Sequence, residues 1–108
     1  MISFKNITIE LFEQEADYTW TAHVYTESKQ FFFISFDPSY GRREETSWED
    51  WGEETCYYYS VDPITDFKII DENGDDVNLN NCKDIKDAIE YIEEAFLEHL
   101  YEHDPEGN

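Results

Sequence analysis

The chain has 108 residues, of which 27 are acidic and 7 are basic, and its formal net charge is −20 at pH 7. Such a charge repels nucleic acid and anionic membranes, which excludes both as direct partners. Aromatic residues make up 18% of the chain. Disordered acidic segments are poor in aromatics, so we expect one folded domain over residues 1–108.

The negative charge is concentrated in the second half of the chain. Residues 1–43 hold six acidic and four basic residues, whereas residues 44–108 hold 21 acidic and three basic residues. The sequence therefore divides into a nearly neutral first part and a strongly anionic second part.

Three segments of the first part have the composition of β-strands. Residues 2–12 and 18–25 alternate between apolar and polar side chains and are rich in β-branched and aromatic residues. The alternation slips near Asn6, which indicates a β-bulge there. Residues 31–36 are apolar in both phases except at Ser35, which predicts a central strand covered on both sides.

Residues 37–54 interrupt this pattern with proline and glycine, and they predict a long acidic loop. Loops of this length in a small domain tend to be functional or disordered. Strands are expected again within residues 55–79, where Asn73 and Gly74 are typical of a type I′ hairpin turn.

The segment 81–103 has the periodicity of an amphipathic helix, with Asn81 as its N-cap. Its apolar residues recur at the i, i+3, i+4, i+7 spacing: Ile85, Ala88, Ile89, Ile92, Ala95, Phe96 and Leu100. A run of strands followed by one helix predicts an α+β fold. We expect an antiparallel sheet of about five or six strands with one long C-terminal helix packed on one face.

The opposite face of this helix is crowded with carboxylates: Asp87, Glu90, Glu93, Glu94, Glu98 and Glu102. Each like-charge pair at i,i+4 costs roughly 0.2–0.5 kcal/mol of helix stability. A helix that carries this repulsion indicates a surface used for binding.

Two motifs resemble metal sites. The segment 99–103, HLYEH, matches the H-x-x-E-H pattern of inverted zinc peptidases. Histidines near a helix C-terminus also complement the helix dipole, which is the simpler interpretation. The segment 71–82 imitates the start of an EF-hand loop but lacks the glycine and the final glutamate of that loop. We expect no metal and no cofactor.

Catalytic groups are not evident. Cys82 is expected among the first helical residues, where a thiolate is favoured, but no histidine is tied to it or to Cys56. The many carboxylates lack a distinctive apolar setting that would raise a pKa. The chain is therefore not expected to be an enzyme.

The compartment is expected to be the cytoplasm. The first residues, MISFKNITIE, lack the basic and apolar regions of a signal peptide. No apolar run approaches the ~18 residues of a membrane span. Two cysteines, Cys56 and Cys82, do not make a disulfide framework.

Charge and size together suggest nucleic-acid mimicry. Twenty charges correspond to about 34 Å of duplex DNA. A compact domain of 108 residues also has a diameter of about 34 Å. In composition the chain resembles phage DNA mimics that block restriction or CRISPR complexes, and acidic immunity proteins that neutralise nuclease toxins. The resemblance implies a small inhibitor of a basic nucleic-acid-binding protein or complex. An immunity protein against a nuclease, or another acidic adaptor, remains an alternative.

The residues expected to contact the partner lie on the outer helix face and in the acidic loop. They are Glu44, Glu45, Trp48, Glu49, Asp50, Trp51, Glu53, Glu54, Asp87, Glu90, Glu94 and Glu98. The carboxylates would stand in for phosphates, and the tryptophans would anchor the contact. The tyrosines at 57–59 have two open interpretations, as core residues or as an exposed interface patch.

Overall fold

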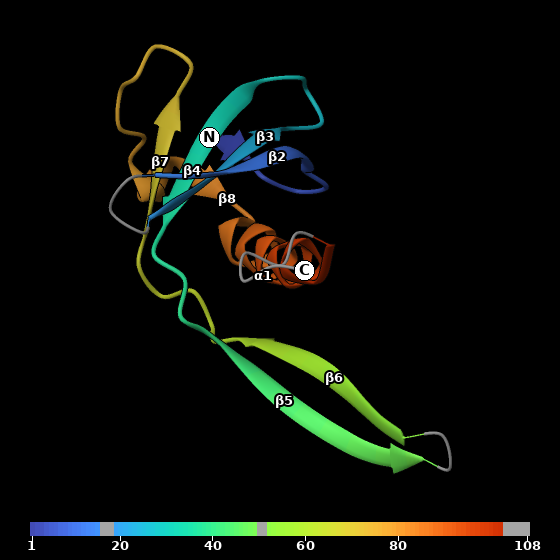
Figure 1. Cartoon of the computed structure of the whole chain (residues 1–108). Coiled ribbons are helices and arrows are strands. Elements are labelled where there is room, and N and C mark those ends of the chain that lie inside the picture. Colours follow the sequence, from blue (N-terminus) through green and yellow to red (C-terminus); the bar gives the residue numbers. More distant parts are fainter. Residues whose placement is uncertain (16–18, 50–51, 103–108) are drawn as a thin grey trace.

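The computed structural model describes residues 1–15, 19–49 and 52–102, with the backbone alone at 47–49 and 53–57 (Figure 1). Its strands are β1 (Ile2–Ser3), β2 (Thr8–Gln14), β3 (Trp20–Tyr25), β4 (Phe31–Phe36), β5 (Tyr40–Glu49), β6 (Gly52–Val61), β7 (Phe67–Asp71) and β8 (Cys82–Lys83). The 3₁₀ turn η1 (Leu79–Asn81) precedes β8, and the helix α1 (Ile85–Glu102) follows it.

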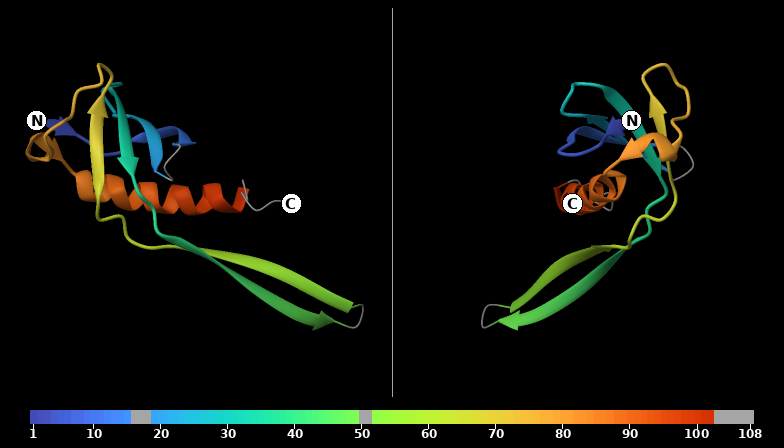
Figure 2. Two further views of the ribbon diagram at one scale, coloured as in Figure 1. Left: turned by 60° about the vertical axis from the view of Figure 1, so that its left-hand side comes forward. Right: turned by 180° about the vertical axis from the view of Figure 1, so that it is seen from behind.

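Four strands form the main sheet, in the order β2-β3-β4-β7, and each neighbouring pair is antiparallel. The helix α1 packs across one face of this sheet (Figures 1 and 2). The predicted α+β class, with a C-terminal helix on an antiparallel sheet, is confirmed. The remaining strands form two smaller two-stranded sheets, β1-β8 and β5-β6.

Alternate strand residues build the core between the sheet and α1. On β4, Phe32, Ile34 and Phe36 are buried, while Phe31 and Phe33 point to the opposite face. The helix contributes the buried residues Ala88, Ile89, Ile92, Phe96 and Leu100. These belong to the predicted apolar stripe, so the helical periodicity identified the packed face correctly.

A bulge changes which residues of β2 face the core. The register with β3 shifts between Ile9 and Leu11, so Leu11 is turned outward and is 45% exposed, while Phe12 packs against the core. The bulge predicted near Asn6 is therefore misplaced. Asn6 instead has a φ of 54° and lies in the connection between β1 and β2.

The helix begins later than predicted. Cys82 and Lys83 form β8, which pairs in parallel with Ile2 and Ser3 of β1. The carbonyl of Asp84 accepts the amide of Ala88 at 3.2 Å, which places Asp84 at the N-cap position instead of Asn81. Pairing with a strand at the far end of the chain is a tertiary contact, and helical periodicity carries no sign of it.

The predicted loop 37–54 is wrong, because most of it is strand. β5 and β6 pair from Tyr40↔Val61 to Glu49↔Gly52 and form a long hairpin, the hairpin arm (residues 40–61). The arm leaves the sheet beside α1 and projects past its C-terminal end (Figure 2). Glycine and acidic residues here resemble loop composition, but a hairpin that projects into solvent needs no apolar alternation.

The arm makes the molecule elongated. Its principal extents are 59 × 27 × 22 Å and its radius of gyration is 16.8 Å, compared with about 13 Å for a compact domain of this length. The predicted compact body, with a diameter equal to one turn of DNA, is therefore wrong.

The turn after β7 also differs from the prediction. The amide of Gly74 donates to the carbonyl of Asp71 at 3.0 Å, and Gly74 has a φ of 89°. Asn73 does not have the positive φ that a type I′ turn requires. The connection is thus a three-residue turn, and only a single bridge, Ile70↔Asp76, follows where a strand was expected.

Candidate functional site

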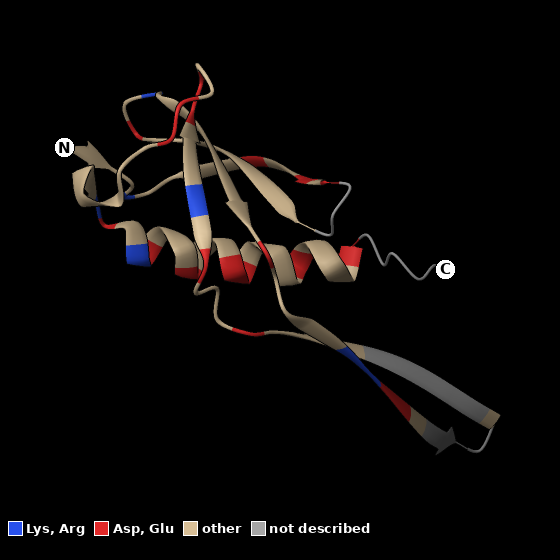
Figure 3. Ribbon diagram, turned by 90° about the vertical axis from the view of Figure 1, so that its left-hand side faces the viewer, with Lys and Arg blue, Asp and Glu red and all other residues tan. Residues whose placement is uncertain are grey.

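The exposed face of α1 carries a line of four carboxylates. Asp87, Glu90, Glu94 and Glu98, called here the acidic row, are all exposed and lie opposite the buried stripe of the helix. Their spacing of three or four residues places successive members on neighbouring turns, about 5.4 Å apart along the axis. Figure 3 shows acidic residues repeated along this side of α1. The structure therefore brings these four predicted residues together.

No ion pair of the described residues involves a member of the acidic row, and His23–Glu13 and Arg43–Glu45 lie elsewhere. Lys83 and Lys86 are the cations nearest to the row in the sequence, four residues before Asp87 and Glu90. Like charges at i,i+4 on a helix repel one another. A cationic surface placed against this face would relieve that repulsion, which makes the row a candidate binding surface for a basic partner.

Glu93 has a different role from the neighbouring carboxylates. It is only half-exposed, and its Oε1 accepts the backbone amide of Ile64 at 2.6 Å. Ile64 is buried in the connection between β6 and β7. Glu93 therefore holds this connection against α1, and its inclusion in the acidic face from the sequence is corrected.

The hairpin arm carries both charge signs near its root. Glu44 and Glu45 are exposed, but Glu45 Oε1 lies 3.0 Å from Nη2 of Arg43. The Arg43 guanidinium also sits 5.3 Å from the centre of the Tyr58 ring. Both arginines precede Glu44 on β5, so they stand between the two glutamates and the body of the protein (Figure 3).

The other residues expected to bind on this segment have no described side chain. The structure places only the backbone of four of them: Trp48, Glu49, Glu53 and Glu54. In the β5–β6 register, Trp48 faces Glu53, Glu49 faces Gly52, and Glu54 faces Ser47. Asp50 and Trp51 lie outside the described residues. Among the three tyrosines, Tyr59 is buried, Tyr58 is 41% exposed, and Tyr57 has no described side chain.

The two acidic surfaces are connected through a tyrosine pair. The hydroxyl of Tyr101 accepts the amide of Tyr59 at 3.0 Å, and the two rings are 5.1 Å apart at 84°. This contact ties the last turn of α1 to the root of the arm. The row lies along the helix, whereas Glu44 and Glu45 lie out on the arm (Figure 3). The acidic row and the pair Glu44 and Glu45 therefore lie on two different elements.

The charge is less dense than on DNA. A net charge of −20 over a length of 59 Å is roughly one charge per 3 Å, compared with one per ~1.7 Å of duplex. The protein thus carries the same sign of charge as a nucleic acid, at about half the linear charge density of duplex DNA.

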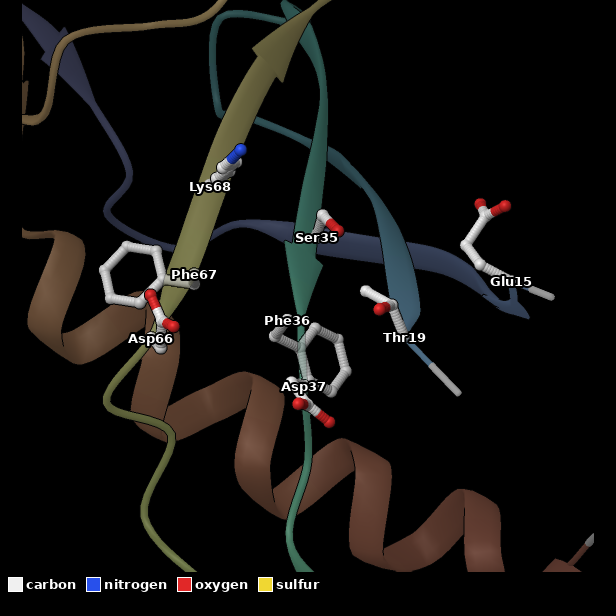
Figure 4. Close-up of a pocket in the computed structure, with 8 residues that line it drawn as sticks. All are labelled: Glu15, Thr19, Ser35, Phe36, Asp37, Asp66, Phe67 and Lys68. Atoms are coloured by element: carbon white, nitrogen blue, oxygen red, sulfur yellow. The ribbon is translucent and has the colours of Figure 1, made fainter. Parts of the chain in front are cut away.

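A shallow pocket of about 410 Å³ opens at the end of the sheet near the arm (Figure 4). It is lined by Glu15, Thr19, Ser35, Phe36, Asp37, Asp66, Phe67 and Lys68. Glu15 stands apart from Asp37 and Asp66 in Figure 4, and it accepts a hydrogen bond from Thr21 at 3.2 Å. The carboxylates do not converge on one point, so the pocket does not assemble an acid–base pair.

Metal-ligating groups do not cluster in the described residues, where no three His, Cys, Asp or Glu side chains are placed to share an ion. His99 packs among the rings of Phe12, Trp20 and Phe96, and His103 lies outside the described residues. Asp71 Oδ1 accepts the amides of Asn73 and Asp75, at 3.0 and 2.9 Å, and so it stabilises the turn.

Cys82 lies on β8, not in the first turn of the helix as predicted. Burial raises the pKa of its thiol, which favours the protonated and less nucleophilic form. Its Sγ lies 3.6 Å from the carbonyl oxygen of Asn78, as a weak donor.

Sequence reasoning missed a second surface, on the sheet face that α1 does not cover. Phe31 and Phe33 point to this face and pack with His23 and Tyr25. Apolar residues in both phases of 31–36 are the signal of this surface in the sequence, and the predicted cover on both sides of this strand is wrong. In the described residues, the helix covers one side only.

Comparison with protein-family models, with curated proteins and with solved structures finds no match for this chain. Among the described residues, no helix has the length and apolar character needed to cross a bilayer.

Proposed function

We propose that this protein is an acidic inhibitor that occupies the basic surface of a nucleic-acid-binding protein or nuclease and competes with its nucleic acid. The observation that carries the proposal is the acidic row, four exposed carboxylates on one helix face with no ion-pair partner among the described residues. The carboxylates take the place of phosphates, and the protein acts in the cytoplasm beside its target.

The elongated shape supports the proposal. The hairpin arm extends the molecule to 59 Å, a length that corresponds to somewhat less than two turns of duplex DNA, at ~34–36 Å per turn. Glu44 and Glu45 give the arm exposed carboxylates beyond the helix. A partner that contacts both surfaces is held by two separate sets of charges, which increases overall affinity when both engage together.

Competition for the partner is the direct test. Basic proteins captured by the full chain from the source cell are purified singly and bound again in the presence of a duplex DNA or RNA. We expect saturating nucleic acid to displace the protein and the association rate to fall steeply as salt is raised, because screening weakens charge steering.

Two double variants distinguish the effect of the acidic row on binding from the effect of the total charge. Glu90→Lys with Glu94→Lys reverses two members of the row, and Glu72→Lys with Asp75→Lys makes the same change in exposed residues of the β7 turn. The first pair should slow association by about tenfold or more, and the second by much less.

Two results would contradict the proposal. One is a complex that survives saturating nucleic acid; the other is an equal effect of the two charge-reversed pairs. Either result would mean that the acidity serves solubility and that the partner is held elsewhere.

A further inference from the structure

The sheet face opposite α1 carries an apolar row that crosses all four strands. The register pairs Leu11 with His23, His23 with Phe33, and Phe33 with Ile70. Side chains at paired positions point to the same side of a sheet. A second row pairs Tyr25 with Phe31. We call these six residues the outer face: Leu11, His23, Tyr25, Phe31, Phe33 and Ile70.

The aromatic residues of the outer face pack on one another. The ring of Phe31 lies 4.9 Å from Tyr25 and 4.8 Å from Phe33, and the ring of Phe33 lies 4.8 Å from His23. None of the six belongs to the buried core or to the partly buried residues packed against it. They form a platform supported by the sheet backbone rather than an extension of the core.

Two rows of this face lack the polar character that a solvated sheet face usually has, while the neighbouring row, Thr21–Ser35–Lys68, is polar. In an antiparallel sheet with one face on the core, the other face is normally polar. Two rows across strands spaced ~4.8 Å apart give an apolar area on the order of 300 Å². Patches of that size on a monomer are often functional.

Two carboxylates, Glu10 and Glu13, lie beside the aromatic residues at the β2 side of the face. Glu13 Oε2 lies 3.1 Å from Nε2 of His23. The negative charge of Glu10, followed by burial and a hydrogen bond between the two side chains, raises the pKa of the Tyr25 hydroxyl. The β7 side of the face has Ile70, with the cation Lys68 one row away beside Ser35. The β2 end of the face is therefore anionic, whereas the β7 end has an apolar residue and one cation.

Two possible occupants fit this chemistry poorly. A four-stranded sheet with exposed aromatics can stack nucleic-acid bases, but such surfaces also need a positively charged groove. Here the β2 side of the rim is anionic, and a single lysine, Lys68, among the face residues named here makes no such groove. A second copy would bring its own net charge of −20 against this rim, and an apolar area of about 300 Å² is well below the ~800 Å² that each partner contributes to a stable interface.

We propose that the outer face binds a short arginine-containing segment of a partner protein. The arginine guanidinium stacks on the rings of Tyr25 and Phe31 and faces Glu10 and Glu13, and an adjoining apolar side chain covers Phe33 and Ile70. Aromatic faces attract guanidinium groups, and a carboxylate beside them adds a charge-assisted hydrogen bond. This site lies on the other side of the sheet from the acidic row and does not depend on it.

The test uses a short probe peptide and the full chain. Acetylated leucine–arginine–phenylalanine–arginine amide is titrated while backbone amide shifts are followed by NMR. The same peptide with citrulline in place of arginine keeps the shape and loses the charge. We expect shifts concentrated on β3 and β4, and binding by the arginine peptide at least about tenfold tighter than by the citrulline peptide.

Matched variants locate the site. Phe31→Thr with Phe33→Thr removes the platform and suits a strand, so it should weaken binding by about tenfold or more. Leu79→Ala with Tyr91→Ala removes two apolar side chains elsewhere (44% and 46% exposed) that are more exposed than the half-buried Phe31 and Phe33, and it should change binding by less than about threefold. Glu10→Gln with Glu13→Gln should weaken the arginine peptide and leave the citrulline peptide unchanged.

The acidic row provides the comparison with the proposed function. Glu90→Lys with Glu94→Lys should leave the pattern of shifts on β3 and β4 unchanged, so failure of one proposal is distinguishable from failure of the other. Shifts confined to α1 or the hairpin arm would overturn this inference, as would equal binding of the two peptides. A dimer seen by sedimentation and abolished by Phe31→Thr with Phe33→Thr would assign the face to a second copy instead.

Discussion

The hydroxyl of Tyr101 contacts both the amide nitrogen of Tyr59, at 3.0 Å, and its carbonyl oxygen, at 3.5 Å. Tyr59 lies on β6, which has β5 as its strand partner, so the other edge of β6 has no neighbour among the described strands. The helix hydroxyl occupies this edge at the root of the arm. A two-stranded hairpin is marginally stable alone, and the contact explains how its root is held to the body.

Removing this hydroxyl should loosen the arm. We expect Tyr101→Phe to lower the free energy of unfolding by about 0.5–1.5 kcal/mol, the usual contribution of one hydrogen bond. Hydrogen exchange at the Tyr59 amide should accelerate more than exchange in β3 or β4. Tyr91→Phe is the control, because Tyr91 is exposed and makes no hydrogen bond among the described residues. Equal exchange in the two variants would contradict this role.

The core between α1 and the sheet should be sensitive to truncation. Ile92 is fully buried, and Ile92→Ala should cost about 2–5 kcal/mol in urea unfolding, because it removes contacts and leaves a cavity. Ile89 is also buried, and its truncation should cost an amount in the same range. Glu94→Ala, two residues further on and on the exposed face, should be close to neutral. A small effect of Ile92→Ala would place this face of the helix in solvent.

Glu93 should behave as a structural residue, unlike the acidic row. Hydrogen bonds to a charged group contribute about 1.5–3 kcal/mol, so Glu93→Ala should destabilise the fold by that amount as it leaves the Ile64 amide without its acceptor. Glu93→Gln keeps an acceptor oxygen and should cost less. Thermal unfolding of the two variants beside Glu94→Ala measures the difference. If all three variants unfolded alike, the 2.6 Å bond would carry no stabilising role.

The thiol of Cys82 should react slowly. Burial raises its pKa in the folded chain, so at mildly alkaline pH a smaller fraction is thiolate than in the unfolded chain. In a Cys56→Ser background, reaction with an aromatic disulfide reagent should be slower in the folded protein than in urea. The pKa of the Cys82 thiol is higher in the folded chain than in the unfolded chain. The contribution of this thiol to the free energy of unfolding is therefore complete below the unfolded pKa and is lost as pH rises through the folded pKa. A faster reaction in the folded state would mean that folding lowers the pKa of the Cys82 thiol, which would contradict this prediction.

Local patterns in the sequence determined the elements whose neighbours are close in the chain. The bounds of β4 and β7 follow from short apolar runs, and the buried face of α1 follows from its 3.6-residue period. The exposure of Asp87, Glu90, Glu94 and Glu98 follows from the same period, because residues opposite the apolar stripe face solvent.

Contacts between distant segments were decided only by the tertiary structure. Leu11 faces solvent and Phe12 faces the core because the register between β2 and β3 shifts at a bulge after Ile9. Cys82 belongs to a strand because it pairs with Ile2. Glu93 and Glu94 are identical in sequence terms, yet one binds Ile64 and the other faces solvent. Period and composition describe a residue's own element, whereas the partner across the fold depends on how the whole chain packs.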